Sequence, residues 1–145
     1  MKSTGLCLLL FCSTVTVCEA EEGFTIEQLP PSVVKTSPQA GDAAVDPSLD
    51  KISVTFSKEM MTERMWSVVQ VSKEHFPKIR ETPQGIHYLG DKRTCVIPVE
   101  LQPNQTYVLW INRGKYNSFR DTGNNPSVPY LLVFHTTESS PKAGD

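Results

Sequence analysis

The strongest constraint on the fold of this chain is the segment from Ser37 to Met60, in which a turn-rich stretch leads directly into a strand. The turn part reads SPQAGDAAVDPSLD, and its prolines, glycine and aspartates are typical turn residues. From Lys51 to Phe56 polar and apolar residues alternate, which is the period of a strand with one face on a core and the other in water. The segment therefore predicts a β-sandwich.

Short extended runs separated by turn residues recur along the chain, at the spacing of a sandwich rather than of alternating strands and helices. The predicted strands are Val33–Thr36, Lys51–Phe56, Ser67–Val71, Ile86–Leu89, Thr94–Val99, Tyr107–Asn112 and Tyr130–Thr137. No long amphipathic helix is predicted, and the stretch from Met60 to Trp66 is long enough only for a helical turn capped by Thr62. We expect an all-β domain over residues 33–137.

The amino terminus indicates export. Lys2 precedes an apolar run from Leu6 to Val17, and small side chains precede a cut after Ala20, so residues 1–20 are predicted to be a signal peptide. The run is too short and too rich in Ser and Thr for a membrane span, which leaves no transmembrane segment after cleavage. A lipid anchor on Cys18 is an alternative. Residues 21–32 and 138–145 are expected to be a leader segment and a polar tail.

Removal of the signal peptide leaves Cys95 as the single cysteine, so the mature domain is predicted to have no disulfide. Cys95, Ile97 and Val99 share one face of a predicted strand, which favours a core role for the thiol over a nucleophilic one. The formal net charge of −2 implies no basic face for nucleic acid or for anionic lipid.

The sequence LQPNQTY at 101–107 places a proline turn before a tyrosine that opens a strand. This pattern is typical of a tyrosine corner, in which the Tyr107 hydroxyl would bond to backbone a few residues upstream and clip a Greek-key crossover. Leu109 stands where an antibody domain carries a cysteine, so packing is expected to replace the disulfide. Asn104-Gln105-Thr106 is also an N-glycosylation sequon.

Five segments together resemble the bacterial Ig-like domain of the S-layer-protein type, known as bacterial Ig-like domain family 5. They are SPQAGDAAVDP at 37–47, ISVTFSKEM at 52–60, LQPNQTY at 101–107, RDTGN at 120–124 and FHTT at 134–137. The resemblance implies an Ig-like β-sandwich of about seven strands with Greek-key connections. It also implies a module of exported or cell-surface bacterial proteins that has no catalysis or cofactor of its own.

Met60, Met61 and Met65 lie close together in the sequence, and thioethers suit Cu(I) in an oxidising compartment. Periplasmic copper-resistance carriers have a similar sandwich, but they use a histidine at the mature amino terminus, where this chain would have Glu21. Met60 also belongs to the FSKEM pattern, in which it would serve packing. Core packing is therefore the favoured interpretation, and a periplasmic copper carrier is kept as an alternative.

The segment from Lys115 to Tyr130 is too long and too aromatic for a minimal hairpin, and end loops of a sandwich commonly bind partners. The binding-loop candidates are Tyr116, Phe119, Asp121 and Asn124. Asp121 with Asn124 and Asn125 could offer oxygens to calcium, but this set is sparse for six to eight ligand positions. We favour a turn in which Asp121 and Asn124 bond their own backbone and Gly123 takes a positive φ.

Trp66, Trp110 and Tyr116 could form a flat platform for a sugar, so a carbohydrate-binding module is a further alternative. No G-x-S-x-G elbow, H-E-x-x-H pair or phosphate-binding glycine loop is present, and the three histidines are dispersed. The sequence predicts a non-enzymatic exported module, periplasmic, secreted or on the cell surface, which acts by contact with a protein or another component of the cell envelope.

Overall fold

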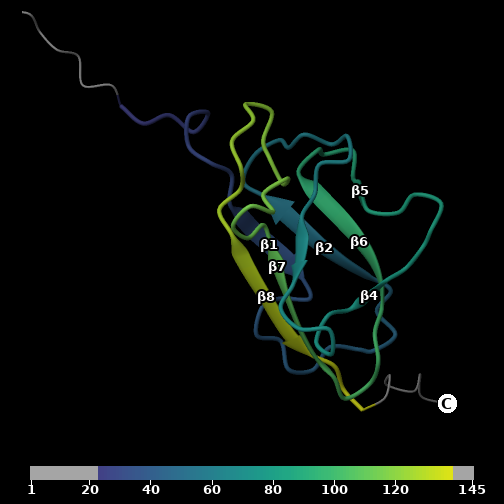
Figure 1. The fold of residues 1–145 in the computed structure, drawn as a ribbon. Coiled ribbons are helices and arrows are strands. Elements are labelled where there is room, and N and C mark those ends of the chain that lie inside the picture. Colours follow the sequence, from purple (N-terminus) through teal and green to yellow (C-terminus); the bar gives the residue numbers. More distant parts are fainter. Residues whose placement is uncertain (1–22, 139–145) are drawn as a thin grey trace, which may run out of the picture.

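A computed structural model describes residues 23–138 as two stacked antiparallel sheets, and no helix occurs in this range (Figure 1). The eight strands are β1 (Val33–Ser37), β2 (Lys51–Phe56), β3 (Val68–Gln70), β4 (Lys78–Ile79), β5 (His87–Tyr88), β6 (Thr94–Glu100), β7 (Thr106–Ile111) and β8 (Tyr130–His135). The predicted signal peptide, the Cys18 anchor and all of the predicted tail beyond residue 138 lie outside the described residues.

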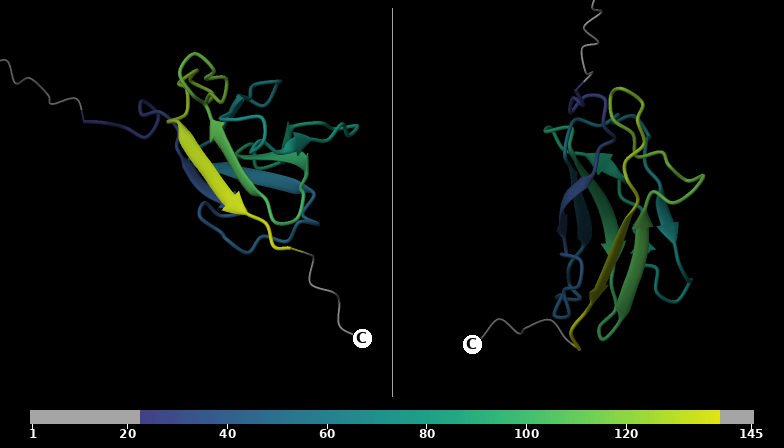
Figure 2. Two further views of the ribbon diagram at one scale, coloured as in Figure 1. Left: turned by 60° about the horizontal axis from the view of Figure 1, so that its bottom comes forward. Right: turned by 90° about the vertical axis from the view of Figure 1, so that its left-hand side faces the viewer.

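The strands follow an Ig-like Greek-key order. One sheet has the order β1-β2-β6-β4, with β5 also paired to β6, and the other has the order β3-β7-β8. The chain crosses between the two layers three times, after β2, after β3 and after β6, and the layers separate clearly in Figure 2. This is the arrangement of a constant-type immunoglobulin sandwich, in which β4 and β5 together take the place of the fourth strand of the larger sheet.

All seven predicted strands are present, with ends shifted by at most two residues, and the eighth was not predicted. That strand, β4, has only two residues, which pair with Val99 and Glu100 of β6. The predicted helical turn from Met60 to Trp66 is absent. Its first amides are used elsewhere, since Met60 N donates to Lys92 O and Met61 N to Arg120 O, and Arg64 has a left-handed φ of 55°.

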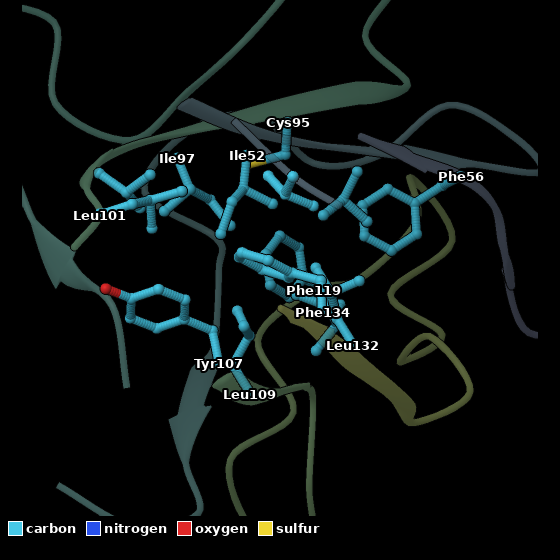
Figure 3. Close-up of a cluster of buried hydrophobic side chains, with 14 of the residues drawn as sticks. Ile52, Phe56, Cys95, Ile97, Leu101, Tyr107, Leu109, Phe119, Leu132 and Phe134 are labelled. Atoms are coloured by element: carbon cyan, nitrogen blue, oxygen red, sulfur yellow. The ribbon is translucent and has the colours of Figure 1, made fainter. Parts of the chain in front are cut away.

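The core lies between the two sheets and is made by the alternate residues of each long strand (Figure 3). Ile52 and Phe56 of β2 meet Leu109 of β7 and Phe134 of β8, and each of these side chains is at most 1% exposed. Cys95 of β6 is fully buried among them as a free thiol, as predicted, and burial raises its pKa to about 12. The thiol is therefore a core side chain and not an activated nucleophile.

The tyrosine corner is also confirmed. The amide of Gln102 donates to the Tyr107 hydroxyl at 2.7 Å, and Thr136 Oγ1 donates to the carbonyl of Gln102 at 2.6 Å. The turn between β6 and β7 is thus fastened to the end of β8. These bonds hold the crossover between the two sheets.

The segment that opens with Ser37-Pro38 leaves the first sheet and covers the free edge of β8. Gly41 N donates to Val133 O at 2.7 Å, His135 N donates to Asp42 O at 2.8 Å, and Val45 forms a parallel bridge with Thr136. Gly41 has a φ of 85°, which a residue with a side chain would adopt only with strain. This segment therefore protects an edge that could otherwise pair with another chain.

Candidate functional site

The outer face of the β3-β7-β8 sheet is apolar at its centre. On β7 and β8, buried residues alternate with half-buried or exposed ones, which point away from the core. Trp110 pairs with both Val69 and Leu131 to form one cross-strand row, and Val108 pairs with Val133 in the next. Leu131 is 40% exposed. We call these five side chains the outer apolar face.

In the other sheet, β2 has a polar outer face, as alternation predicts. Lys51, Ser53 and Thr55 of β2 face outward, and Ser53 and Thr55 pair with Ser37 and Lys35 of β1. Polar and apolar alternation was predicted for Lys51–Phe56, and a difference between the outer faces of the two sheets was not predicted. The signal was available, because residues 130–134 read YLLVF, a continuous apolar run typical of a strand that is covered on both faces.

The loop between β7 and β8 is folded around Asn112, which sequence analysis had placed only at the end of a strand. Asn112 is 1% exposed and has a left-handed φ of 58°. Its Nδ2 donates to Phe119 O and Ser127 O, and its Oδ1 accepts from Phe119 N at 3.0 Å. One buried amide therefore ties both arms of the loop together, which leaves a tight hairpin from Arg113 to Tyr116 at the surface.

The four binding-loop candidates fall into two groups. Tyr116 is 55% exposed at the end of that hairpin, and Asn124 is exposed with a φ of 67°. Phe119 is fully buried, with its ring centre 5.2 Å from that of Phe56, so the expectation that the loop presents Phe119 to a partner is wrong. The loop needs this aromatic ring for anchorage in the core.

Asp121 is also buried, at 2% exposure, and it links two motifs of the sequence. Its Oδ2 lies 2.6 Å from Lys58 Nζ, and its Oδ1 accepts from Asn125 N at 2.8 Å. Burial raises the pKa of the Asp121 carboxyl, but the bonds from Lys58 and Asn125 outweigh this effect and hold the pKa below its ordinary value. The carboxylate is therefore held by Lys58 and Asn125.

The turn expected around Asp121 has a different left-handed residue from the one predicted. Asn124 N donates to Asp121 O, but the positive φ belongs to Asn124 and not to Gly123. A side chain at Gly123 would have its Cβ 3.3 Å from Asp121 Oδ1 and 3.2 Å from Asn125 Nδ2. Glycine is therefore favoured here by close approach to the carboxylate rather than by backbone conformation.

The three methionines considered for copper occupy different environments. Met60 is 1% exposed within the core cluster, Met61 is 36% exposed, and Met65 is half-buried. Met60 thus has the packing role that the FSKEM pattern favoured. Among residues 23–138, no group of three or more His, Cys, Asp or Glu side chains could hold a metal ion.

The three aromatic residues of the proposed sugar platform come from three segments of the chain. Trp110 lies on the outer apolar face, with the Arg113 guanidinium 5.3 Å from its ring centre. Tyr116 closes the hairpin opposite Arg113. Trp66 packs against the core and lines a groove that also contains Tyr88. Trp66 therefore shares a groove with Tyr88, which was not among the predicted platform residues.

No helix in the described part of the chain is long and apolar enough to cross a membrane. In the comparisons with known proteins, the model of a family described as bacterial Ig-like domain matches residues 27–136. No curated protein matches the chain.

Three similar solved structures are chains of S-layer protein SbsC. The crystal structure of rSbsC(31-844) is 16% identical with a TM-score of 0.48, and the match covers 78% of this chain and 14% of that one. The structure of domains 1–6 of SbsC is 14% identical with a TM-score of 0.44, and the match covers 79% of this chain and 14% of that one. The crystal structure of the N-terminal part of SbsC is 17% identical with a TM-score of 0.41, and the match covers 75% of this chain and 24% of that one.

Proposed function

This chain belongs to the bacterial Ig-like domain family, and from that premise we propose that it is a non-catalytic exported module that acts by contact with a protein or with the cell surface. Export is supported by the predicted signal peptide at residues 1–20, and a domain of residues 33–137 would remain after cleavage. Amino-terminal sequencing of the protein from its source should find Glu21 as the first residue. Retention of Met1 would contradict export by this route.

The observation that carries the contact function is the outer apolar face. A sandwich needs apolar side chains only between its sheets, and outward residues of a solvated strand are normally polar, as they are on β2. On β3, β7 and β8 the outward rows instead contain Val69, Trp110, Leu131 and the pair Val108 and Val133. A contiguous apolar area on a folded surface is a mark of an interaction site.

The geometry of this face suits another protein. Strand rows give a flat surface, and a half-buried tryptophan at its centre is the type of residue that dominates the binding energy of protein interfaces. Arg113 lies beside Trp110 at the rim and adds a cation to the edge of the area. An apolar centre with a polar rim is the usual anatomy of such interfaces.

A charge placed in the outer apolar face tests this function. Tagged wild type, Leu131→Glu and the matched control Val34→Glu would each be incubated with the envelope fraction of the source organism, and the captured proteins compared. Val34 is a suitable control because it is an exposed apolar residue, at 57%, on β1 of the other sheet. We expect Leu131→Glu to lose at least one partner that Val34→Glu retains.

Two further results make the test decisive. Both variants should keep the far-ultraviolet circular dichroism and thermal midpoint of wild type, since both changes are at exposed positions. Analytical ultracentrifugation would show whether the lost partner is a second copy of the chain. Identical capture by wild type and Leu131→Glu would exclude the outer apolar face as the contact surface.

A further inference from the structure

A groove of about 460 Å³ lies between the segment that follows β2 and the segment around β5, at the edge of the five-stranded sheet. The first wall is formed by residues 62–64 and 66, and the second by residues 84 and 86–90 with Lys92. β5 pairs with Cys95 and Val96 near the beginning of β6, and Figure 1 shows β5 beside that strand. The lining of the groove includes none of the five residues of the outer apolar face, so this inference goes beyond the proposed function.

The base of the groove is aromatic and anchored. Trp66, Ile86 and Tyr88 line it while they also pack against the core, so each is held by the interior and has only part of its surface in the groove. Tyr88 Oη reaches Met65 O at 3.5 Å, which links the two walls. His87 Nδ1 lies 2.9 Å from Gly85 O, and because a carbonyl only accepts, the ring must donate there and direct Nε2 elsewhere.

Two cations enter the groove from constrained positions. Arg64 and Lys92 line it, and both have left-handed backbones, with φ of 55° and 53°. The backbone of Lys92 is fixed on both sides, because its N donates to Leu89 O and its O accepts from Met60 N. Residues other than glycine rarely adopt the left-handed backbone conformation, because it costs free energy. The presence of an arginine and a lysine with this conformation in one groove therefore suggests a functional use.

The charge of the groove is unbalanced in a way that favours an anion. Within residues 23–138 neither Arg64 nor Lys92 forms an ion pair, while Lys58 and Lys78 do. Glu63 is the single carboxylate among the lining residues. The whole chain has a formal net charge of −2, whereas the groove has more cationic than anionic side chains.

We propose that this groove binds an acidic saccharide, whose ring face lies on Trp66 and whose carboxylate meets Arg64 and Lys92. A flat half-buried indole offers apolar contact to one face of a sugar ring. A guanidinium and an ammonium offer charge-assisted bonds to a carboxylate. Gln84 and Thr62 supply an amide and a hydroxyl for the sugar hydroxyls.

A saccharide fits this groove better than an acidic peptide does. An extended peptide would gain affinity by pairing with a free strand edge, but β5 has only two residues, His87 and Tyr88. The volume of the groove is that of a small-ligand site rather than of a protein interface. Its mixed lining of aromatic, amide and cationic groups matches a ligand that is polar at its rim and flat on one face.

Binding would be measured with the purified protein by isothermal titration and by tryptophan fluorescence. The probes are a tetramer of galacturonate, a neutral tetramer of galactose and a hexapeptide of glutamate. The variants are Arg64→Gly and Lys92→Gly, because glycine tolerates positive φ and each change should preserve the fold. Lys73→Ala is the matched control, since Lys73 is an exposed cation outside the groove.

We expect galacturonate to bind and the neutral tetramer to bind at least tenfold more weakly. Each glycine variant should weaken galacturonate binding about tenfold at an unchanged thermal midpoint, and Lys73→Ala should match wild type. Equal binding of the two saccharides, no binding at millimolar concentration, or tighter binding of the glutamate peptide would overturn the proposal. None of these results depends on Leu131, so failure here is distinguishable from failure of the outer apolar face.

Discussion

Replacement of Lys58 by methionine should destabilise the domain by about 3 kcal/mol, because it leaves the Asp121 carboxylate buried without a cation. Asp121 is 2% exposed, and Lys58 is 17% exposed at the side chain. Loss of one partner of a buried ion pair costs about 3–5 kcal/mol, and the lower end applies because Asn125 still donates twice to the carboxylate. Methionine keeps most of the lysine stem, so packing changes little.

Lys58 also organises the segment that precedes β1. Its Nζ donates to the carbonyls of Ile26 and Glu27, at 3.0 and 3.2 Å, in addition to its contact with Asp121. The Lys58→Met variant should therefore release residues 26–29 as well as weaken the domain. A cycle with Asp121→Asn separates the two effects: the double variant should be more stable than the sum of the single losses by about 1–3 kcal/mol.

The effect of Lys58→Met should depend on pH in a defined direction. The pKa of Asp121 is lower in the folded protein than in the unfolded chain, where it is about 4. The ionised carboxylate therefore stabilises the fold at pH values above about 4. This stabilisation is lost as the pH falls through the lower pKa of the folded state. Without Lys58 that pKa rises. The difference in unfolding free energy between wild type and variant should therefore narrow as pH falls below about 4.

Urea unfolding followed by tryptophan fluorescence and circular dichroism would measure these differences. Lys78→Met is the matched control, because Lys78 pairs with Glu100 at 2.7 Å while both side chains are exposed, at 72% and 47%. Exposed pairs contribute about 0–1 kcal/mol. If Lys58→Met costs no more than Lys78→Met at pH 7, or if the difference is independent of pH, the structural role assigned to the buried pair is refuted.

Three further predictions concern the core and its corner. Tyr107→Phe should cost about 1 kcal/mol in urea unfolding, because the Gln102 amide loses its acceptor, whereas Tyr116→Phe at the exposed hairpin should stay within about 0.5 kcal/mol. Phe119→Ala should cost about 3–5 kcal/mol, since it empties a fully buried site, and a loss below 1 kcal/mol would contradict its placement in the core. Cys95 should not react with a thiol reagent in the native protein at pH 8, because it is buried and its pKa is raised to about 12; labelling faster than global unfolding would be inconsistent with this burial.

The strands of this domain could be predicted because alternation is a local property of the sequence. Lys51–Phe56 was predicted with its observed bounds, because the polarity of each residue indicates whether its side chain faces the core or water. The strand Lys78–Ile79 has only two residues, which are too few to show an alternating pattern, so it could not be predicted from the sequence. Tyr107 could be recognised because its corner spans only the few residues back to Gln102.

The binding surfaces were harder to predict because their residues come from distant segments. Nothing in the sequence around Arg64 indicates that its backbone is left-handed or that Lys92 shares its groove. Asp121 resembled a turn residue, and only the fold shows that Lys58 occupies its second oxygen. Phe119 looked available because an aromatic residue in a loop has no period by which burial can be read.

The two proposed surfaces should act independently, because they share no residue. The outer apolar face is carried by β3, β7 and β8, and the groove by β5 with the segment before β3. Leu131→Glu changes an exposed side chain and Arg64→Gly a left-handed loop residue, and the sites are expected to share no contact. Saccharide binding should therefore survive Leu131→Glu, and partner capture should survive Arg64→Gly. Loss of both activities in either single variant would mean that one continuous surface, or a change in the fold, accounts for both.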